Sequence, residues 1–174
     1  QAREALCRAY GKGYRSVAIA LLHSYRNSEH EKKLGEMAQQ QGFTQVSLSH
    51  EASALIKLVA RGDTTVADAY LTPILKRYVN QVRDALGAGT VERLMFMQSN
   101  GGLTDADMFH GRDSILSGPA GGVVGMVGTA AKDGFDRLIG FDMGGTSTDV
   151  CHYAGEMQHS FREKPGLATE FKKK

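Results

Sequence analysis

The sequence has little of several features that mark particular classes of protein. Its two cysteines, Cys7 and Cys151, lie far apart and form no Cys-x-x-Cys pair. A disulfide framework and a zinc knuckle are therefore not expected, and reduced thiols in a cytoplasmic protein are favoured. No apolar run approaches the roughly 18 residues of a membrane span, and no signal peptide precedes the first predicted helix. We expect no membrane partner.

Charge of one sign is also scarce. The chain has 21 Lys and Arg against 19 Asp and Glu, a net charge of +2, which is too balanced to indicate nucleic-acid binding. The one basic cluster, Lys172–Lys174, is interpreted as a solvated tail. Hydrophobic residues make up 41% of the chain, which is enough for a buried core. Because the chain begins at Gln1 and ends in a polar tail, we expect it to be a piece of a longer protein.

A Walker phosphate loop is missing as well, since Gly-x-x-x-x-Gly-Lys-[Ser/Thr] occurs nowhere. What stands in its place is a pattern of strand, glycine turn and strand. An apolar run from Leu138 ends at Asp142, and a second strand pattern extends from Asp149 to Tyr153. The pattern predicts that residues 138–142 and 149–153 are adjacent antiparallel strands, joined by a turn over residues 143–148.

The chemistry of this turn suits a phosphate. Glycines let backbone N–H groups approach an anion, and hydroxyl groups add further donors. The predicted phosphate-binding residues are Gly144, Gly145, Thr146, Ser147 and Thr148. Asp142 and Asp149 flank these donors, an arrangement that suits phosphate together with a divalent cation better than bare phosphate. The alternative is a hairpin whose hydroxyls only cap turns.

Gly145 is predicted to be the most sensitive position of the turn. A Cβ there should either require an unfavourable positive φ or intrude on the phosphate, so substitution should harm binding more than folding.

The first third of the chain alternates helix and strand. A short helix over residues 1–10 is followed by an apolar strand, Ser16–Leu22, of the kind buried in a parallel sheet. Ser28 and Glu31 have capping-box spacing and open a helix that stops at Gly42, before a strand over residues 46–49. This order predicts α/β architecture.

Histidines and short motifs in this region are given structural interpretations. Residues 23–26 follow the first strand's carboxyl end, where ligands often bind in such sheets. His23, His30 and His50 nevertheless lack metal-ligand spacing. The Arg61-Gly-Asp63 tripeptide is not interpreted as an adhesion motif.

A long helix is predicted from about Thr65 to Leu86, with Asp63 or Thr64 as its cap and Pro73 as a kink or a new first turn. Apolar residues with helical period are predicted to form its core-facing stripe. They are Val66, Ala69, Tyr70, Ile74, Tyr78 and Val82.

Two further glycine-rich elements are candidates for ligand binding. A strand over residues 92–97 leads into the loop Gln98–Gly102, whose Ser99, Asn100 and Gly101 would bring donors to a ligand. The alternative is an ordinary strand-to-helix turn with Asn100 in left-handed geometry.

The second element opens a helix that ends before Gly134. Its candidate ligand-binding residues are Ser117, Gly118, Gly121 and Gly122. Ser117 is predicted to cap this helix, and Pro119 fits its first turn. Gly122, Gly125 and Gly128 would permit close helix approach, either in a helix that slides when a cleft closes or in a static core helix.

The string from Asp142 to Val150 resembles the phosphate loops of the actin and sugar-kinase ATPase superfamily, and more closely the hydantoinase A/5-oxoprolinase family. Further matching strings occur along most of the chain. They are Leu22–Tyr25 with His30 and Glu31, Ser47–Glu51, Ala69–Pro73, Met97–Gly102 and Ser117–Gly125. The resemblance implies a fragment of an actin-like (ribonuclease H-like) ATPase core, with a mixed sheet and flanking helices. It places the end of the family's N-terminal domain at residues 1–60 and a truncated start of its ATPase domain at residues 61–174.

The resemblance also implies an activity. Residues Tyr153–Glu156 with His159 are similar to the 5-oxoprolinase branch, which opens 5-oxoproline to glutamate with ATP and Mg²⁺. ATP and a small cyclic amide would be the partners of the full-length enzyme, which we expect to be an oligomer. A hydantoinase or acetone carboxylase-type subunit, or a non-catalytic binding or assembly piece, remains the alternative. The family's earlier phosphate loop and later adenosine-binding stretch are missing, so this chain alone is expected to be inactive, and its catalytic residues are not identified.

Overall fold

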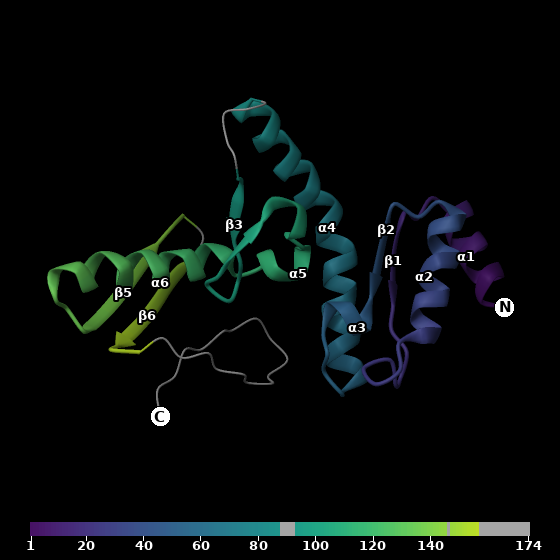
Figure 1. Ribbon diagram of the computed structural model, residues 1–174, viewed down its shortest axis with the longest axis horizontal. Coiled ribbons are helices and arrows are strands. Elements are labelled where there is room, and N and C mark those ends of the chain that lie inside the picture. The colour runs from purple at the N-terminus through teal and green to yellow at the C-terminus, as the bar shows by residue number, and fades with distance from the viewer. Residues whose placement is uncertain (88–92, 146, 157–174) are drawn as a thin grey trace. The chain divides into compact units, whose positions relative to one another are not determined.

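The computed structural model describes residues 1–87, 93–145 and 147–156 (Figure 1). The chain divides into two compact units. The first comprises Gln1–Glu92 with His110–Arg112, and the second comprises Arg93–Phe109 with Asp113–Lys174. The predicted family boundary after residue 60 falls inside a continuous helix of the first unit, so it does not coincide with the division between the compact units.

The first unit is a two-stranded parallel sheet between helices. Its elements are α1 (Ala2–Gly11), β1 (Ser16–Ile19), α2 (Glu29–Gln41), β2 (Gln45–Leu48), α3 (Ser49–Ala52) and α4 (Leu58–Leu86). Strands β1 and β2 pair in parallel from Ser16 opposite Gln45 to Ile19 opposite Leu48. Helices α1 and α2 lie on one side of the strands and α4 on the other (Figure 1). The predicted alternation of strand and helix is confirmed, although β1 is shorter than the apolar run.

The predicted capping box at the start of α2 is wrong. Ser28 is the N-cap residue but makes no side-chain cap hydrogen bond. Glu31 instead turns inward and is completely buried, where it accepts hydrogen bonds from residues outside α2. A capping box needs the carboxylate to point back along its own helix, and buried partners compete successfully for it here. The helix ends at Gly42, with φ +103°, as predicted.

Helix α4 begins at Leu58, seven residues before the predicted start at Thr65. Asp63 and Thr64 therefore lie inside the helix and do not cap it, and the Thr64 hydroxyl donates to the Ala60 carbonyl at 3.0 Å. Pro73 also lies inside the helix.

Of the core stripe predicted for α4, Ala69 is buried as predicted, but the larger apolar side chains are not. Val66 and Tyr70 are 59% and 71% exposed, and Ile74 and Tyr78 are also exposed. The buried face is mostly polar, and its residues are Arg61, Thr65, Asp68, Ala69, Thr72 and Val79. Helical periodicity identifies a stripe, but it does not state which stripe faces the sheet when polar side chains find buried partners.

The second unit contains two antiparallel hairpins and a helix. Its elements are β3 (Met95–Met97), β4 (Leu103–Asp105), the 3₁₀ helix η1 (Ala106–Met108), α5 (Gly111–Ser114, shared with the first unit), α6 (Ser117–Ala130), the 3₁₀ helix η2 (Ala131–Asp133), β5 (Arg137–Met143) and β6 (Thr148–Ala154). Helix α6 packs against β3, β5 and β6. Gly134, with φ +82°, ends η2. Part of the strand predicted over residues 92–97 lies outside the described residues.

Ser117 is not the N-cap of α6. Leu116 takes that position, and the Ser117 hydroxyl donates to the Ser114 carbonyl at 2.9 Å. Pro119 lies in the first turn of the helix, as predicted.

The mixed α/β fold class is confirmed, with parallel and antiparallel pairing in separate two-stranded sheets of the described chain. None of the helices in the described residues has the length and apolar character to cross a membrane.

Candidate functional site in the second unit

The β5–β6 hairpin is the element on which the site is built. Residues predicted as strands, Leu138–Asp142 and Asp149–Tyr153, pair antiparallel, and Asp142 lies directly opposite Asp149. The Gly144 N–H donates to the Ser147 carbonyl at 2.9 Å and closes the turn. Thr146 lies outside the described residues. The predicted strand, turn and strand are therefore confirmed.

Gly145 does not need the conformational freedom of glycine. Neither Gly144 nor Gly145 has a positive φ, and a Cβ added at Gly145 would meet nothing within 4 Å. The positive-φ part of the prediction for Gly145 is wrong, because this residue has no left-handed geometry. The alternative reason, intrusion on a phosphate, stays a prediction.

The inner face of the hairpin packs on α6 through sulfur-containing side chains. Strand alternation brings Gly140, Asp142 and their partners Cys151 and Asp149 to one face. The Cys151 Sγ lies 3.9 Å from the Met126 Sδ of α6. A Cβ added at Gly140 would lie 2.7 Å from the same Met126 sulfur and would also clash with Cys151. Gly140 is thus the position where strand and helix approach closely.

The glycine stripe of α6 was predicted to serve such close packing, and no described residue packs against it. A Cβ added at Gly122, Gly125 or Gly128 would meet nothing within 4 Å. Among the described residues of the second unit, nothing therefore covers the stripe, and its role in close packing stays a prediction. Gly122 lines a cavity. Because glycine has no side chain, it leaves room there for a ligand, whereas the sequence had suggested room for a neighbouring helix.

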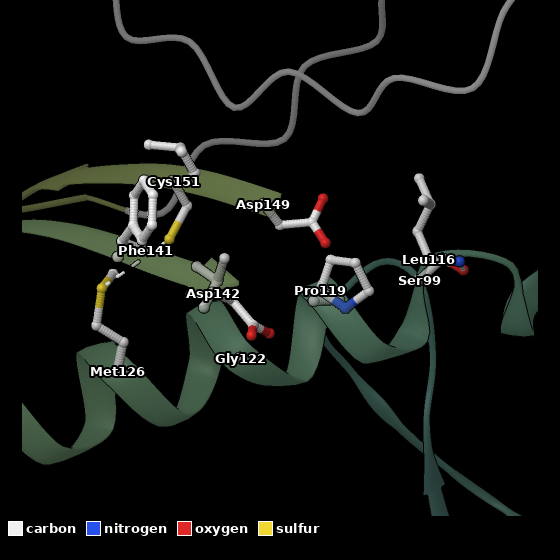
Figure 2. A pocket seen from close by; sticks show the side chains of 13 residues that line it. Ser99, Leu116, Pro119, Gly122, Met126, Phe141, Asp142, Asp149 and Cys151 are labelled. Carbon is white, nitrogen blue, oxygen red and sulfur yellow. Dashed lines mark hydrogen bonds between the residues drawn. The ribbon is translucent and has the colours of Figure 1, made fainter. Parts of the chain in front are cut away.

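A cavity of about 590 Å³ lies between the hairpin and α6 (Figure 2). Figure 2 shows the carboxylates of Asp142 and Asp149 extending from the strands toward the α6 turns that hold Pro119 and Gly122. The lining residues are Ser99, Leu116, Pro119, Ala120, Gly122, Val123, Met126, Gly140, Phe141, Asp142, Asp149, Val150 and Cys151. The volume lies within the range of small-molecule sites.

The cavity brings together four of the residues proposed from the sequence. Ser99, Gly122, Asp142 and Asp149 line it. The remaining described residues proposed as ligand-binding do not line it, and their binding roles stay predictions. They are Asn100, Gly101, Ser117, Gly118, Gly121, Gly144, Gly145, Ser147 and Thr148. Sequence reasoning missed the apolar wall formed by Leu116, Met126 and Cys151, because no local motif marks residues that meet only through packing.

The loop Gln98–Gly102 uses its polar groups internally. The Ser99 hydroxyl donates to the Asp113 carbonyl at 2.7 Å and accepts from the Leu116 N–H at 2.9 Å. The Asn100 Oδ1 accepts from the Gly102 N–H at 2.8 Å. Gly101 holds the positive φ of +82°, so the alternative of a left-handed Asn100 is wrong, and the turn joins two strands. The two Ser99 hydrogen bonds hold this loop against the segment that leads into α6.

The electrostatics of the cavity are set by the two opposed carboxylates. Asp142 and Asp149 are exposed, and within the part of the chain that the structure describes neither has a hydrogen-bond or ion-pair partner. Like charges directly opposite on two strands repel, so a divalent cation would stabilise this arrangement. The described residues contain no group of three or more His, Cys, Asp or Glu that could hold a metal. A cation here would take its other ligands from water or phosphate, as Mg²⁺ commonly does.

Comparison with known proteins gives consistent relatives. The hydantoinase/oxoprolinase family model matches residues 61–173, and the model of the family's N-terminal region matches residues 1–42. The 5-oxoprolinase of Saccharomyces cerevisiae is 50% identical over 87% of this chain, which spans 12% of that enzyme's length.

Two solved structures are similar in fold. A nucleotide-free acetone carboxylase, described as carrying out ATP-dependent acetone carboxylation, has a TM-score of 0.79 at 26% identity and matches 90% of this chain and 23% of its own. The ATP-dependent caprolactamase of Pseudomonas jessenii has a TM-score of 0.75 at 30% identity, over 87% of this chain and 22% of its own. With a family model covering most of its length and these structural relatives, the chain belongs to the hydantoinase/oxoprolinase family.

Proposed function

We propose that this chain is a segment of an ATP-dependent 5-oxoprolinase, the enzyme that converts 5-oxo-L-proline, ATP and water to L-glutamate, ADP and phosphate. The observation on which this rests is the pair Asp142 and Asp149, opposed across the hairpin at a cavity of nucleotide-compatible size. The chain is 50% identical to the matched segment of the yeast 5-oxoprolinase, which favours 5-oxo-L-proline over the other substrates of the family.

The residues of the second unit fit ATP with Mg²⁺. Asp142 and Asp149 would hold the cation directly or through water, since hard oxygen ligands are those that Mg²⁺ prefers. The turn at residues 144–148 would offer backbone N–H and hydroxyl donors to phosphate oxygens. Gly122 leaves the cavity open where a side chain would enter it. ATP with Mg²⁺ would supply the phosphoryl group and the positive charge that make a stable lactam reactive toward water.

The proposal extends to the organisation of the parent enzyme. We assign residues 1–60 to the end of its N-terminal domain and residues 61–174 to the start of its ATPase domain, which is supported by the separate matches at 1–42 and 61–173. Both cysteines are free thiols in the structure, which is compatible with a cytoplasmic enzyme. The full-length enzyme would bind a small cyclic amide and form an oligomer, and this segment alone would not turn over.

Calorimetric titration of the chain with ATP and Mg²⁺ tests the proposal. We expect saturable binding that requires Mg²⁺ and is lost in Asp142→Ala. Asp136→Ala is the matched control, because Asp136 is an exposed carboxylate of the same unit that does not line the cavity. A folded chain that binds no ATP would favour a non-catalytic assembly piece. Equal binding by the two variants would contradict the role proposed for Asp142.

The alternative with specific support is an acetone carboxylase-type subunit, because that structure gives the higher of the two TM-scores. The full-length reading frame discriminates between the two. ATP hydrolysis by the full-length protein should rise with 5-oxo-L-proline and not with acetone and bicarbonate. The reverse result would assign the chain to the carboxylase branch.

A further inference from the structure

A second cavity, of about 740 Å³, lies in the first unit at the carboxyl end of β1. It is formed by the turn that follows this strand and by the first turn of α2. The residues that matter for its chemistry are His23, Tyr25, Arg26, Asn27, Glu29 and Lys32. The cavity is separate from the one beside α6, since the two share no lining residue.

The charge of this cavity favours an anion. Arg26 and Lys32 are both exposed cations, and within the described part of the chain neither has an ion-pair partner. Glu29 is the one acidic residue of the lining, so the two cations exceed it even with His23 neutral. Two unpaired cations that face one concave surface are poised to bind an anion from two directions.

Hydrogen-bond donors complement the two cations. The Asn27 Oδ1 accepts from the Glu29 N–H at 3.2 Å, which leaves the two amide hydrogens of the Asn27 side chain for a ligand. The ring of Tyr25 lies 6.4 Å from the ring of His23, measured between centroids. An apolar ring beside a cationic rim matches a small molecule that has both an apolar body and a negative group.

Buried side chains hold the turn after β1 in place. The Arg61 guanidinium donates to the Leu21 and Leu22 carbonyls, and its central carbon lies 5.6 Å from the centroid of the Tyr25 ring. The Ser24 hydroxyl donates to the Leu21 carbonyl at 3.0 Å and contacts the Ser49 hydroxyl at 2.9 Å. A turn fixed in this way loses little conformational entropy when a ligand binds.

We propose that this cavity binds a small organic carboxylate, with Arg26 and Lys32 as the charged contacts. Resting on the proposed function, we identify that ligand as 5-oxoproline, whose carboxylate would meet the cations and whose ring would lie along the aromatic side chains.

Binding to the chain is measured by calorimetry and by NMR chemical-shift changes with three probes. They are 5-oxo-L-proline, the same ring without its carboxylate (2-pyrrolidinone), and inorganic phosphate. We expect 5-oxo-L-proline to bind saturably in the millimolar range or tighter, to shift the signals of residues 23–32, and to bind at least about tenfold more tightly than the neutral ring.

Charge-neutralising variants test the contacts. Arg26→Gln and Lys32→Gln should each weaken 5-oxo-L-proline binding by about threefold to tenfold, and the two together by more. Lys33→Gln is the matched control, because Lys33 is exposed on the same helix but does not line the cavity. Circular dichroism spectra should show that all four variant chains stay folded, since these side chains are exposed.

Several outcomes would overturn the proposal. They are the absence of saturable binding, equal binding of the neutral ring, an equal effect of Lys33→Gln, or shifts confined to the β5–β6 hairpin. Tighter binding of phosphate than of 5-oxo-L-proline would overturn the assignment to a carboxylate and point to a phosphate group as the occupant. Failure here is distinguishable from failure of the proposed function, because ATP binding and its loss in Asp142→Ala are measured independently at the other unit.

Discussion

Charged side chains are arranged differently in the two units. In the first unit, buried Glu31 accepts from the Ser49 hydroxyl at 2.6 Å and from the His50 Nδ1 at 2.7 Å, and Arg61 donates to the same Ser49 at 2.9 Å. In the second unit, Asp142 and Asp149 oppose each other with no partner among the described residues. A buried polar group whose hydrogen bonds are all made within the protein stabilises the fold. Unpaired like charges at a cavity instead favour the binding of a ligand of opposite charge.

The same contrast applies to Asp68 of α4. This buried carboxylate accepts from the Ser47 hydroxyl at 2.7 Å and the Thr72 hydroxyl at 3.1 Å, and the Arg112 Nη1 lies 3.6 Å away. No buried polar side-chain atom among the described residues lacks a hydrogen-bond partner. The polar face of α4 is therefore a structural feature of the first unit.

The largest effect is expected at Arg61. Its guanidinium donates to Ser49 and to four backbone carbonyls, so Arg61→Met removes a donor from each of these acceptors. The Leu21 carbonyl alone keeps a described side-chain donor, the Ser24 hydroxyl. We expect the first unit to lose about 3–5 kcal/mol of unfolding free energy, because each buried acceptor left without a partner costs about 1–3 kcal/mol. Urea unfolding followed by circular dichroism, with hydrogen exchange resolving the two units, measures the loss. Arg77→Met, at an exposed position of the same helix, should change stability by less than about 0.5 kcal/mol. Equal losses of unfolding free energy in the two variants would contradict the structural role assigned to Arg61.

The next effect concerns Glu31 and pH. Burial by itself raises the pKa of Glu31, but hydrogen bonds from Ser49, His50 and the Leu21 N–H outweigh it and lower that pKa from 4.5 to about 2. A lowered folded-state pKa means stability that is fully present above about pH 4.5 and is lost as pH falls toward about 2. The shift corresponds to about 3 kcal/mol.

The variant Glu31→Gln should therefore destabilise the first unit at pH 7 by about 3 kcal/mol. Its unfolding free energy should also depend less on pH in the acid range. Unfolding free energies measured from pH 2 to pH 7 check both effects. Glu36→Gln, at an exposed position of α2, is the control and should leave the profile unchanged. An unaltered pH profile in Glu31→Gln would contradict the role assigned to this carboxylate.

A smaller effect separates two glycines of the second unit. Gly140→Ala places a Cβ against Met126 and Cys151 and should destabilise this unit by about 1–3 kcal/mol. Gly145→Ala places a Cβ in open space without a positive φ, so stability should change little. Hydrogen exchange of β5 and β6 measures both. Comparable losses at the two positions would contradict the packing described for the hairpin.

The Gly145 position also tests the phosphate loop in the full-length enzyme. Gly145→Val should remove most ATP-dependent ring opening while the protein stays folded, and Thr148→Ser, which keeps a hydroxyl, should be milder. Full turnover in Gly145→Val would show that this hairpin is not the phosphate loop.

The smallest effect is expected at Asp142 and has the opposite sign to that at Glu31. Without divalent cations, Asp142→Asn removes the repulsion with Asp149 and should stabilise the hairpin by about 0.2–1 kcal/mol. Added Mg²⁺ should stabilise the unsubstituted chain and not the variant. Thermal unfolding with and without Mg²⁺ measures both. If Asp142→Asn destabilised the chain as Glu31→Gln does, the contrast between the two units would fail.

Much of the site was predictable because its signal is local. The hairpin follows from an apolar run, a glycine turn and a second run within residues 138–153, and the opposition of Asp142 and Asp149 follows from the register that such a turn imposes. The end of α2 at Gly42 was predictable for the same reason, since left-handed geometry there selects glycine.

Two of the errors share one cause, which is that local sequence patterns do not indicate which residues a side chain will contact in the folded protein. Glu31 matched a capping box, yet its partners are Leu21, Ser49 and His50, all outside its own helix. The apolar stripe of α4 matched a core face, but the partners of Arg61 and Asp68 turned the polar face inward.

The sequence by itself determined the family, the α/β class, the hairpin and its two carboxylates, because each depends on residues close together in the chain. Only the tertiary structure decided which face of α4 is buried, that Gly140 is a point of close packing, and which polar groups are already bonded. These depend on contacts between residues that are distant in the chain, such as Arg61 with Leu21, Ser24 with Ser49 and Gly140 with Met126, for which no local spacing carries a signal.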